Sequence, residues 1–428
     1  MVFLITYPCM TKEQLRQEMD VLQAAYTRFL AGTRTMNISR GKPSRQQLEQ
    51  VSDILYAVAD GSECMADGID VRNYGELCGI PSARAYWADL LGCKPEQTFV
   101  GGTASLNLMF DVISRAYSHG LARSRQPWCK EPVVKFLCPS PGYDRHFRIT
   151  EFFGAELITV PMTPTGPDMD LVEELVKDPQ VKGIWCVPKY SNPDGIIYSE
   201  QTVRRFAWLQ PAAPDFAIMW DNAYCVHEFE GEYVPFPSLL QLSEEVGDGH
   251  MVYEFASTSK ITFAGGGISV MAASEENIAY FTKLFGVQMI SQDKVNQLRH
   301  VRYLKNKEHT LQIMKRHAAI LAPKFQKVLQ LLDMHIAPCG FASWHRPTGG
   351  YFISLNTMPG TAKRALELCK KAGLEMTAAG ATYPYGVDPN DSNIRIAPSL
   401  PPVEELHDAM TLFCVCLKIA AIEKLLAQ

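Results

Sequence analysis

The sequence contains no C-x-x-C pair, no long block of like charges and no apolar run long enough for a bilayer. Its 12 cysteines are unevenly spaced, and a chain with 47% hydrophobic residues does not need disulfides, so we expect reduced thiols in a cytoplasmic protein. The net charge of −5 comes from interspersed charges and gives no nucleic-acid footprint. The most apolar late stretch, Ala409 to Leu417, is far shorter than the roughly 20 residues of a membrane helix.

The opening MVFLITYPCM lacks both a basic start and a small-residue cleavage site, so it makes a poor signal peptide. We expect it to pack on a partner surface instead. The length of 428 residues suits two domains, because single cores stop growing below that size. We predict N-terminal helices over residues 1–60 that join a small C-terminal domain over 301–428, with a large domain over 61–300 between them.

Apolar periodicity predicts the elements of these parts. Thr11 precedes a helix that ends near Gly32, and a second helix follows through Leu48, Val51, Leu55 and Val58. Between about residues 95 and 275, short apolar runs alternate with amphipathic helices, which favours an α/β fold with a mainly parallel sheet covered on both faces. Beyond residue 300 we expect a long helix from Tyr303 to Leu332, a strand in GGYFISLN, and helices over 362–372 and from Pro402.

Six motifs follow the predicted strands, and each alone has an ordinary structural interpretation. The glycines in VGGTASL, Gly101 and Gly102 before Thr103, leave backbone N–H groups free for an anion, although most such pairs are turns. Asn192 in VPKYSNPDGIIY is by itself a loop residue. Tyr143 and His146 in CPSPGYDRHF would usually be packing groups.

The remaining motifs carry charge. Asp221 ends an apolar strand in MWDNAYCV, three residues before Tyr224, and a buried carboxylate needs a partner or a function. Lys260 in FASTSKITFAGGG lies beside Ser257 and Ser259, and alone it would be assigned to the surface. Arg395 in NIRIAPSL would form a structural ion pair.

The order and spacing of the motifs separate these alternatives. Asn192 precedes Asp221 by 29 residues, Asp221 precedes Lys260 by 39, and Lys260 precedes Arg395 by 135. From NISRGKPS to RIAPSLPP the chain resembles the class I/II aminotransferases of fold type I, which depend on pyridoxal 5′-phosphate (PLP). Its motifs are most similar to the bacterial aspartate aminotransferase subgroup related to the aminotransferase domains of MocR-type regulators. The resemblance implies the PLP-dependent transferase fold, with a large domain and a smaller α+β domain.

The resemblance also implies a role for each matching residue. Lys260 would carry PLP as an aldimine and shuttle the substrate proton, which requires a lowered pKa. Asp221 would keep the pyridine nitrogen protonated, which makes the ring an electron sink. His146 would orient Asp221 from behind. Asn192 and Tyr224 would hydrogen-bond the cofactor phenolate, and Asn192 would also face the substrate.

Other matches concern the ring, the phosphate and the substrate carboxylate. Tyr143 would stack on the ring, and Arg395 would clamp the α-carboxylate with its bidentate fork. Tyr74 in NYGELCG would reach the phosphate of a neighbouring subunit, which implies a homodimer. The predicted phosphate cup consists of Gly101, Gly102, Thr103, Ser257 and Ser259. We predict no metal site.

One departure concerns the phosphate. Many relatives place an arginine eight residues after the lysine, but this chain has Ile268 there. Either backbone dipoles and hydroxyls carry more of the binding, or another cation replaces the arginine. Lys294, Arg299 and Arg302 are candidates, and an exposed basic helix face explains them equally well.

The substrate is expected to be a dicarboxylic amino acid. Such a substrate needs a second cation, since a desolvated carboxylate without a partner binds poorly. We prefer Arg40 in SRGKPS over Lys294, because that loop lies beside the substrate in relatives. The predicted reaction moves the amino group of aspartate to 2-oxoglutarate.

Two other functions remain open at this stage. An aromatic aminotransferase or a PLP lyase uses the same scaffold, because the protein selects which bond breaks. A PLP-fold regulator would need a DNA-binding domain ahead of NISRGKPS, and only about 35 residues precede it, too few for a helix-turn-helix module.

Overall fold

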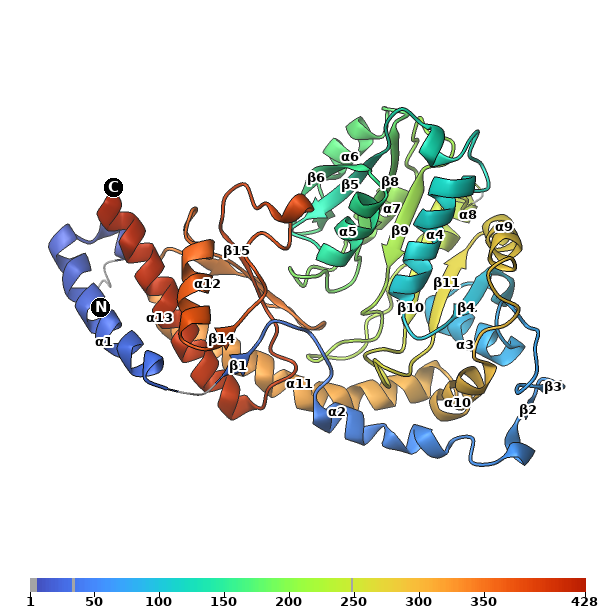
Figure 1. Ribbon diagram of the computed structural model, residues 1–428, viewed down its shortest axis with the longest axis horizontal. Helices are drawn as coiled ribbons and strands as arrows, with labels where there is room; N and C mark the ends of the chain where they lie inside the picture. Colours follow the sequence, from blue (N-terminus) through green and yellow to red (C-terminus); the bar gives the residue numbers. More distant parts are fainter. Residues whose placement is uncertain (1–5, 33–34, 248) are drawn as a thin grey trace.

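The computed structural model describes residues 6–32, 35–247 and 249–428, and it contains two bodies that face one another (Figure 1). The apolar opening run over residues 1–5, predicted to pack on a partner, lies outside the described residues. Among the described helices, none combines the length and apolar character that a bilayer crossing requires.

The larger body is built on an eight-stranded sheet with the order β4-β11-β10-β9-β8-β5-β6-β7. The five central strands from β10 to β6 run parallel, whereas β11 is antiparallel to both of its neighbours and β7 is antiparallel to β6. This confirms the predicted α/β class with a mainly parallel sheet. The strands are β4 (Thr98–Gly101), β5 (Lys135–Ser140), β6 (Glu156–Thr163), β7 (Gly166–Pro167), β8 (Val181–Cys186), β9 (Ala217–Asp221), β10 (Val252–Ser257) and β11 (Ser269–Ala273).

Helices cover both faces of this sheet, because its strands are apolar on both sides. Along β9 the buried side chains alternate: Ala217 and Met219 enter one hydrophobic cluster, and Ile218 and Trp220 enter the other. The next residue, Asp221, ends the strand at the carboxyl edge of the sheet. The helices are α3 (Pro81–Leu91), α4 (Ser105–His119), α5 (Asp144–Phe152), α6 (Met169–Leu175), α7 (Glu200–Ala207), α8 (Leu239–Val246) and α9 (Glu275–Phe285). A small hairpin, β2 (Met65–Ala66) and β3 (Ile69–Asp70), precedes them.

The smaller body joins the two ends of the chain. Helix α1 (Lys12–Leu30) begins at Thr11 with a capping box to Gln14, as predicted, and its buried face shares one hydrophobic cluster with the C-terminal helices. A parallel pair, β1 (Met36–Asn37) and β14 (Leu374–Glu375), links the same regions. The other elements are α11 (Lys307–His335), β12 (Ser343–Trp344), β13 (Ile353–Asn356), α12 (Ala362–Lys371), β15 (Asn393–Ile396) and α13 (Val403–Ala427).

Two predicted helices differ from those observed. The expected helix 303–332 is split, because Lys305 adopts φ 61° and the Asn306 side chain caps the new helix α11. Its first residues instead end α10 (Lys294–Leu304). The expected helix through Leu48 is short, α2 (Arg45–Gln50), followed by a 3₁₀ turn that leaves Leu55 54% exposed.

Candidate active site

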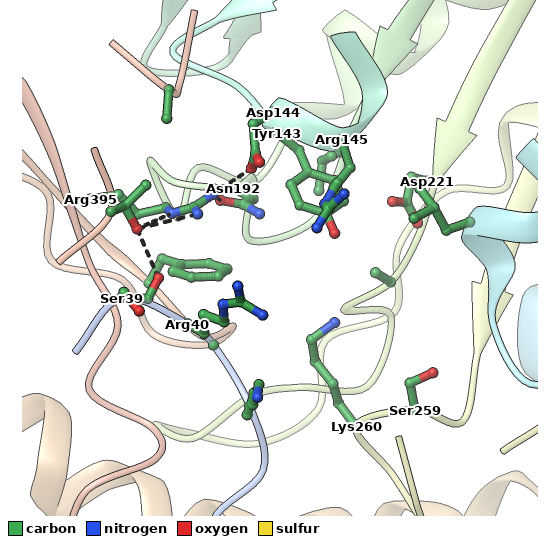
Figure 2. Close-up of a pocket in the computed structure, with 18 of the residues that line it drawn as sticks. Ser39, Arg40, Tyr143, Asp144, Arg145, Asn192, Asp221, Ser259, Lys260 and Arg395 are labelled. Atoms are coloured by element: carbon green, nitrogen blue, oxygen red, sulfur yellow. Dashed lines mark hydrogen bonds and ion pairs between the residues drawn. The ribbon is translucent and has the colours of Figure 1, made fainter. Parts of the chain in front are cut away.

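A cavity of about 800 Å³ lies between the two bodies (Figure 2). The larger body contributes the ends of β9 and β10 and the starts of α4 and α5, and the smaller body contributes β15 and loop 37–42. Nine predicted residues meet there, and the close-up draws several of them around one space. They are Arg40, Tyr143, Asn192, Asp221, Tyr224, Ser257, Ser259, Lys260 and Arg395.

Asp221 is a buried carboxylate with one satisfied oxygen and one free oxygen. Its Oδ2 lies 2.9 Å from His146 Nε2, and the His146 ring stacks on Trp185 at 4.5 Å, which fixes the imidazole from behind. Its Oδ1 is buried and has no hydrogen-bond partner among the described residues. An unpartnered buried carboxylate oxygen is costly. Beside a cavity, it favours a cationic N–H donor from a ligand.

Lys260 follows β10 in a turn and lines the cavity opposite Asp221 (Figure 2). Its Nζ lies 5.0 Å from the centre of the Tyr224 ring and 5.8 Å from that of Tyr351. Desolvation in this surrounding lowers the pKa of the Lys260 amine, and the negative charge of Asp221 opposes that shift. A lowered pKa favours the neutral amine that a nucleophile or general base requires.

The predicted phosphate cup is only partly at the cavity wall. Ser257 and Ser259 line it, and their hydroxyls are 3.1 Å apart. Gly101, Gly102 and Thr103 are not lining residues, whereas Ala104 and Ser105 at the start of α4 are. A glycine at position 101 is explained by packing, because a Cβ there would lie 2.9 Å from the Leu108 side chain.

The three cations suggested by the sequence lie away from this cup. Lys294 is buried and donates to the Gly75 carbonyl at 3.1 Å, and Arg302 donates to the Ala57 carbonyl at 3.3 Å. Neither these two nor Arg299 lines the cavity. Ile268 is a core residue at 1% exposure. At the predicted cup, the cavity wall of this chain therefore consists of the first turn of α4 and the two serines.

Arg395 enters the cavity from β15 and is held on several sides. Its Nη1 donates to Asp144 Oδ1 at 3.2 Å and to Asn192 Oδ1 at 3.3 Å, and its Nη2 donates to Thr377 at 3.3 Å. The Phe352 ring covers the guanidinium at 4.8 Å. The loop that carries Arg40 closes onto that ring, since a Cβ at Gly41 would lie 2.6 Å from it.

The aromatic residues of the site occupy two walls. Tyr143 precedes α5 and meets His146 edge-on at 4.8 Å, and burial raises the pKa of Tyr143 to about 12. Tyr224 is buried beside Tyr351, and burial raises its pKa well above the ordinary value. Both phenols therefore stay protonated and can donate hydrogen bonds. Tyr74 is 76% exposed and does not line the cavity of this chain.

The polar cavity residues that sequence reasoning missed include Lys42, Asp144, Arg145 and Thr377. Asp144 and Arg145 lie inside the CPSPGYDRHF motif, next to Tyr143, so adjacency was a usable signal. Thr377 is different. It is 18 residues from Arg395 along the chain, and its contact with Arg395 comes only from the tertiary fold.

The residues present fit pyridoxal phosphate. The free Oδ1 of Asp221 suits a protonated pyridine nitrogen, and Lys260 suits the aldehyde carbon. The start of α4 with two serine hydroxyls suits the phosphate, because helix N-termini bind anions. Arg395 suits a carboxylate.

Comparison with known proteins agrees with the geometry. The family model described as aspartate amino-transferase matches residues 10–428. An aspartate aminotransferase of Corynebacterium glutamicum is 51% identical over 388 residues, covering 91% of this chain and 90% of that protein. The crystal structure of an aspartate transaminase from the same species superposes with a TM-score of 0.96 at 47% identity, covering 98% and 99% of the two chains.

A more distant structure shares the fold. The α-aminoadipate aminotransferase of Thermus thermophilus, complexed with N-(5′-phosphopyridoxyl)-L-leucine, has a TM-score of 0.74 at 20% identity and covers 95% of this chain and 96% of its own. The fold is therefore that of the PLP-dependent aminotransferases, as predicted. On the match over nearly the whole chain, this protein belongs to the aspartate aminotransferase family.

Proposed function

We propose that this protein is a PLP-dependent transaminase that moves the amino group of aspartate to 2-oxoglutarate. The observation that carries the proposal is the buried, unpartnered Oδ1 of Asp221, in one cavity with Lys260 and Arg395. A buried acceptor, an amine of lowered pKa and an arginine fork are the three groups that amino-acid chemistry on pyridoxal phosphate needs. The two-body fold brings them together from distant parts of the chain.

Asp221 would hold the cofactor nitrogen and keep it protonated, with His146 orienting the carboxylate through its 2.9 Å contact. Withdrawal of electrons from the substrate Cα is the chemistry that pyridoxal phosphate supplies when bound. Tyr143 would pack on the ring face, while Tyr224 and Asn192 would hydrogen-bond its phenolate oxygen. Ser257, Ser259 and the start of α4 at Ala104 and Ser105 would hold the phosphate.

Lys260 would act both as the attachment point and as the base at Cα. Its surroundings lower the pKa of the amine, so Nζ can accept a proton from the substrate Cα and return it to a neighbouring carbon. The rings of Tyr224 and Tyr351 limit the positions that Nζ can reach.

Arg395 would bind the substrate α-carboxylate, with Asn192 beside it. Asp144 and Asn192 accept hydrogen bonds from Arg395 Nη1. An incoming carboxylate therefore exchanges with Asp144 rather than meeting a free guanidinium. Arg40, an exposed cation of the cavity, would contact the distal carboxylate.

A homodimer is part of the proposal. Tyr74 is 76% exposed, and Tyr56, Val287 and Ile290 are at least 64% exposed on segments at the same end of the molecule (Figure 1). Burying such side chains against a second copy removes apolar surface from water. Sedimentation of the purified protein tests the dimer, and Tyr74→Phe should weaken PLP retention if this phenol reaches the partner's phosphate.

The proposal also includes a cytoplasmic location and the positions of the domain boundaries. All twelve cysteines are free thiols, which suits the reducing cytoplasm. The domain boundaries near residues 60 and 300 stay a prediction, which limited proteolysis can test.

The test of the central proposal is spectroscopic and catalytic. Protein incubated with PLP and then dialysed should keep a visible absorbance band, and aspartate should remove it. Without 2-oxoglutarate, oxaloacetate should stop at about one equivalent of bound PLP, and continued formation should require 2-oxoglutarate. Lys260→Ala should abolish turnover and the band.

Two results would contradict the proposal. A colourless protein after PLP incubation would refute cofactor binding. Continued product formation without an acceptor, beyond about one equivalent of bound PLP, would indicate a lyase. Arg148→Gln, an exposed change on α5 outside the cavity, is the matched control and should leave both measurements unchanged.

A further inference from the structure

We infer that Arg145 is a second cationic ligand of the substrate's distal carboxylate and, with Arg40, forms the subsite that selects dicarboxylic amino acids. This inference rests on the proposed transaminase function and deepens it. Arg145 supplies its charge from within the same chain that provides Lys260.

The position of Arg145 is fixed by helix α5, which begins at Asp144. The two residues before it in the sequence also line the cavity: Tyr143, and Asp144, which contacts Arg395. Figure 2 shows its side chain in the cavity between Asn192 and Asp221. The guanidinium is therefore at the reacting end of the cavity.

Arg145 is also uncommitted. Its side chain is exposed, lines the cavity, and makes no hydrogen bond or ion pair within the described parts of the chain. Arg395, which enters the same cavity from β15, has Asp144, Asn192 and Thr377 as partners. Of the two, only Arg145 can accept an anion without giving up an existing contact.

The cavity wall has more basic than acidic side chains, so its charge favours the binding of anions. Its wall carries five basic and three acidic side chains, and each acid has a partner: Asp144 contacts Arg395, Asp221 contacts His146, and Glu375 accepts from Asn37 at 2.6 Å. The side chains of Arg40, Lys42 and Arg145 have no hydrogen-bond or ion-pair partner among the described residues.

The reaction involves three anionic groups, the cofactor phosphate and the two substrate carboxylates, and the position of each cation indicates which of them it can bind. The phosphate belongs at the start of α4 with Ser257 and Ser259, and the α-carboxylate belongs at Arg395. Arg145 lies on α5, a different helix from the cup. The remaining anion is the side-chain carboxylate of the substrate.

Local energetics support a ligand-binding role. Arg145 occupies the first turn of α5, where the helix dipole is positive and a cation is unfavourable. An anion placed against Arg145 would relieve this repulsion and would meet the free N–H groups of the same turn. The residue thus opposes helix stability where it would favour a bound carboxylate.

The test compares ligands with one and two carboxylates on the PLP-loaded protein. Arg145→Gln should weaken succinate binding by about 10- to 100-fold, as expected for loss of a charged hydrogen bond, and leave butyrate binding unchanged. The kcat/KM for aspartate should fall by a similar factor, and that for alanine should not. Arg40→Gln should give a loss of the same kind, and Arg148→Gln should give none.

The outcomes separate this inference from the proposed function. Unchanged succinate affinity in Arg145→Gln, or equal losses for succinate and butyrate, overturns the inference while transamination by the parent protein stands. Reduced PLP retention with unchanged selectivity would assign Arg145 to the phosphate and also overturns it. If Arg145→Gln fails to fold, Arg145→Lys should keep succinate binding within about tenfold, because the charge remains but the fork is lost.

Discussion

The two halves of the cavity are built differently. The half contributed by the larger body has groups that are already fixed: Asp221 is 4% exposed, His146 is 1% exposed, and both lie against the sheet. The opposite half has Arg40 on an exposed loop, and its anchor Arg395 is occupied by Asp144. One half is preorganised for a permanent ligand, and the other is arranged for ligands that exchange.

This difference has an energetic basis. A resident cofactor rewards groups that are rigid and desolvated, because no rearrangement is needed when charge develops. A substrate that enters and leaves on every cycle binds best where an internal contact of the protein can be exchanged for a substrate contact of similar strength. The Asp144 carboxylate is such a contact, since it presents to Arg395 the same group that the substrate presents.

The largest effect is expected from breaking the preorganised half at Asp221. Asp221→Asn removes the charge that keeps the cofactor nitrogen protonated, and kcat should fall on the order of 10³-fold, the size of losing one preorganised electrostatic contact. Substrate KM should change little. Retained PLP absorbance with unchanged kcat would show that Asp221 has no such role.

A smaller loss is expected in the exchanging half at Arg395. Arg395→Lys keeps the charge but loses the planar fork, so kcat/KM should fall by about 100-fold for donor and acceptor alike. The amount of bound PLP should not change. A variant that loses PLP instead would move Arg395 to the preorganised half.

Asp144→Asn should give a gain rather than a loss. Without the internal carboxylate, a substrate no longer competes for Arg395, and KM for aspartate and 2-oxoglutarate should drop by about 3- to 10-fold, in line with a partly exposed ion pair. Steady-state kinetics of both half-reactions measures this effect. A raised KM would mean that Asp144 orients Arg395 instead.

The last effect is on stability rather than on kinetics, and it concerns a second buried carboxylate, Glu254 on β10. Burial raises the pKa of Glu254 to about 7 from 4.5, against the hydrogen bond from Asn222. Between pH 4.5 and 7 the unfolded chain releases this proton first, so stability falls as pH rises, by up to about 3 kcal/mol.

Thermal unfolding across pH tests this contribution. Glu254→Gln should melt at a higher temperature than the parent protein at pH 8 and at a similar temperature near pH 5. Equal melting temperatures at both values would exclude the raised pKa. If Glu254→Gln is stabilised at pH 8 as expected, Glu254 is a purely structural cost, unlike Asp221, whose free oxygen faces a ligand site.

Sequence reasoning located the preorganised half better than the exchanging half. Asp221 and Lys260 follow apolar strands whose ends must meet at one sheet edge, so their proximity follows from topology. Arg395 needed the family resemblance, because its strand belongs to another sheet. Asp144 and Arg145 look like ordinary surface charges of an amphipathic helix, and only the second body makes that surface a cavity wall.

The missed helix boundaries have a similar cause. The apolar pattern continues through residues 303–332, but the polar cap Asn306 and the left-handed Lys305 interrupt it. Around Leu48, a buried amide takes the place expected for apolar side chains, since Gln47 donates to the Tyr351 hydroxyl at 3.0 Å. Local patterns do not contain a partner that lies 304 residues away.

The shared core of α1 and α13 also has a consequence during synthesis. The buried face of α1 packs with residues of α13, and Tyr26 donates to the Leu368 carbonyl, 342 residues further along the chain. A ribosome releases α1 first and its partner surface last, so the apolar face of α1 stays uncovered while the central sheet is being made. The chain therefore exposes the apolar face of α1 during almost its entire translation, and we expect a chaperone that binds apolar segments to bind α1.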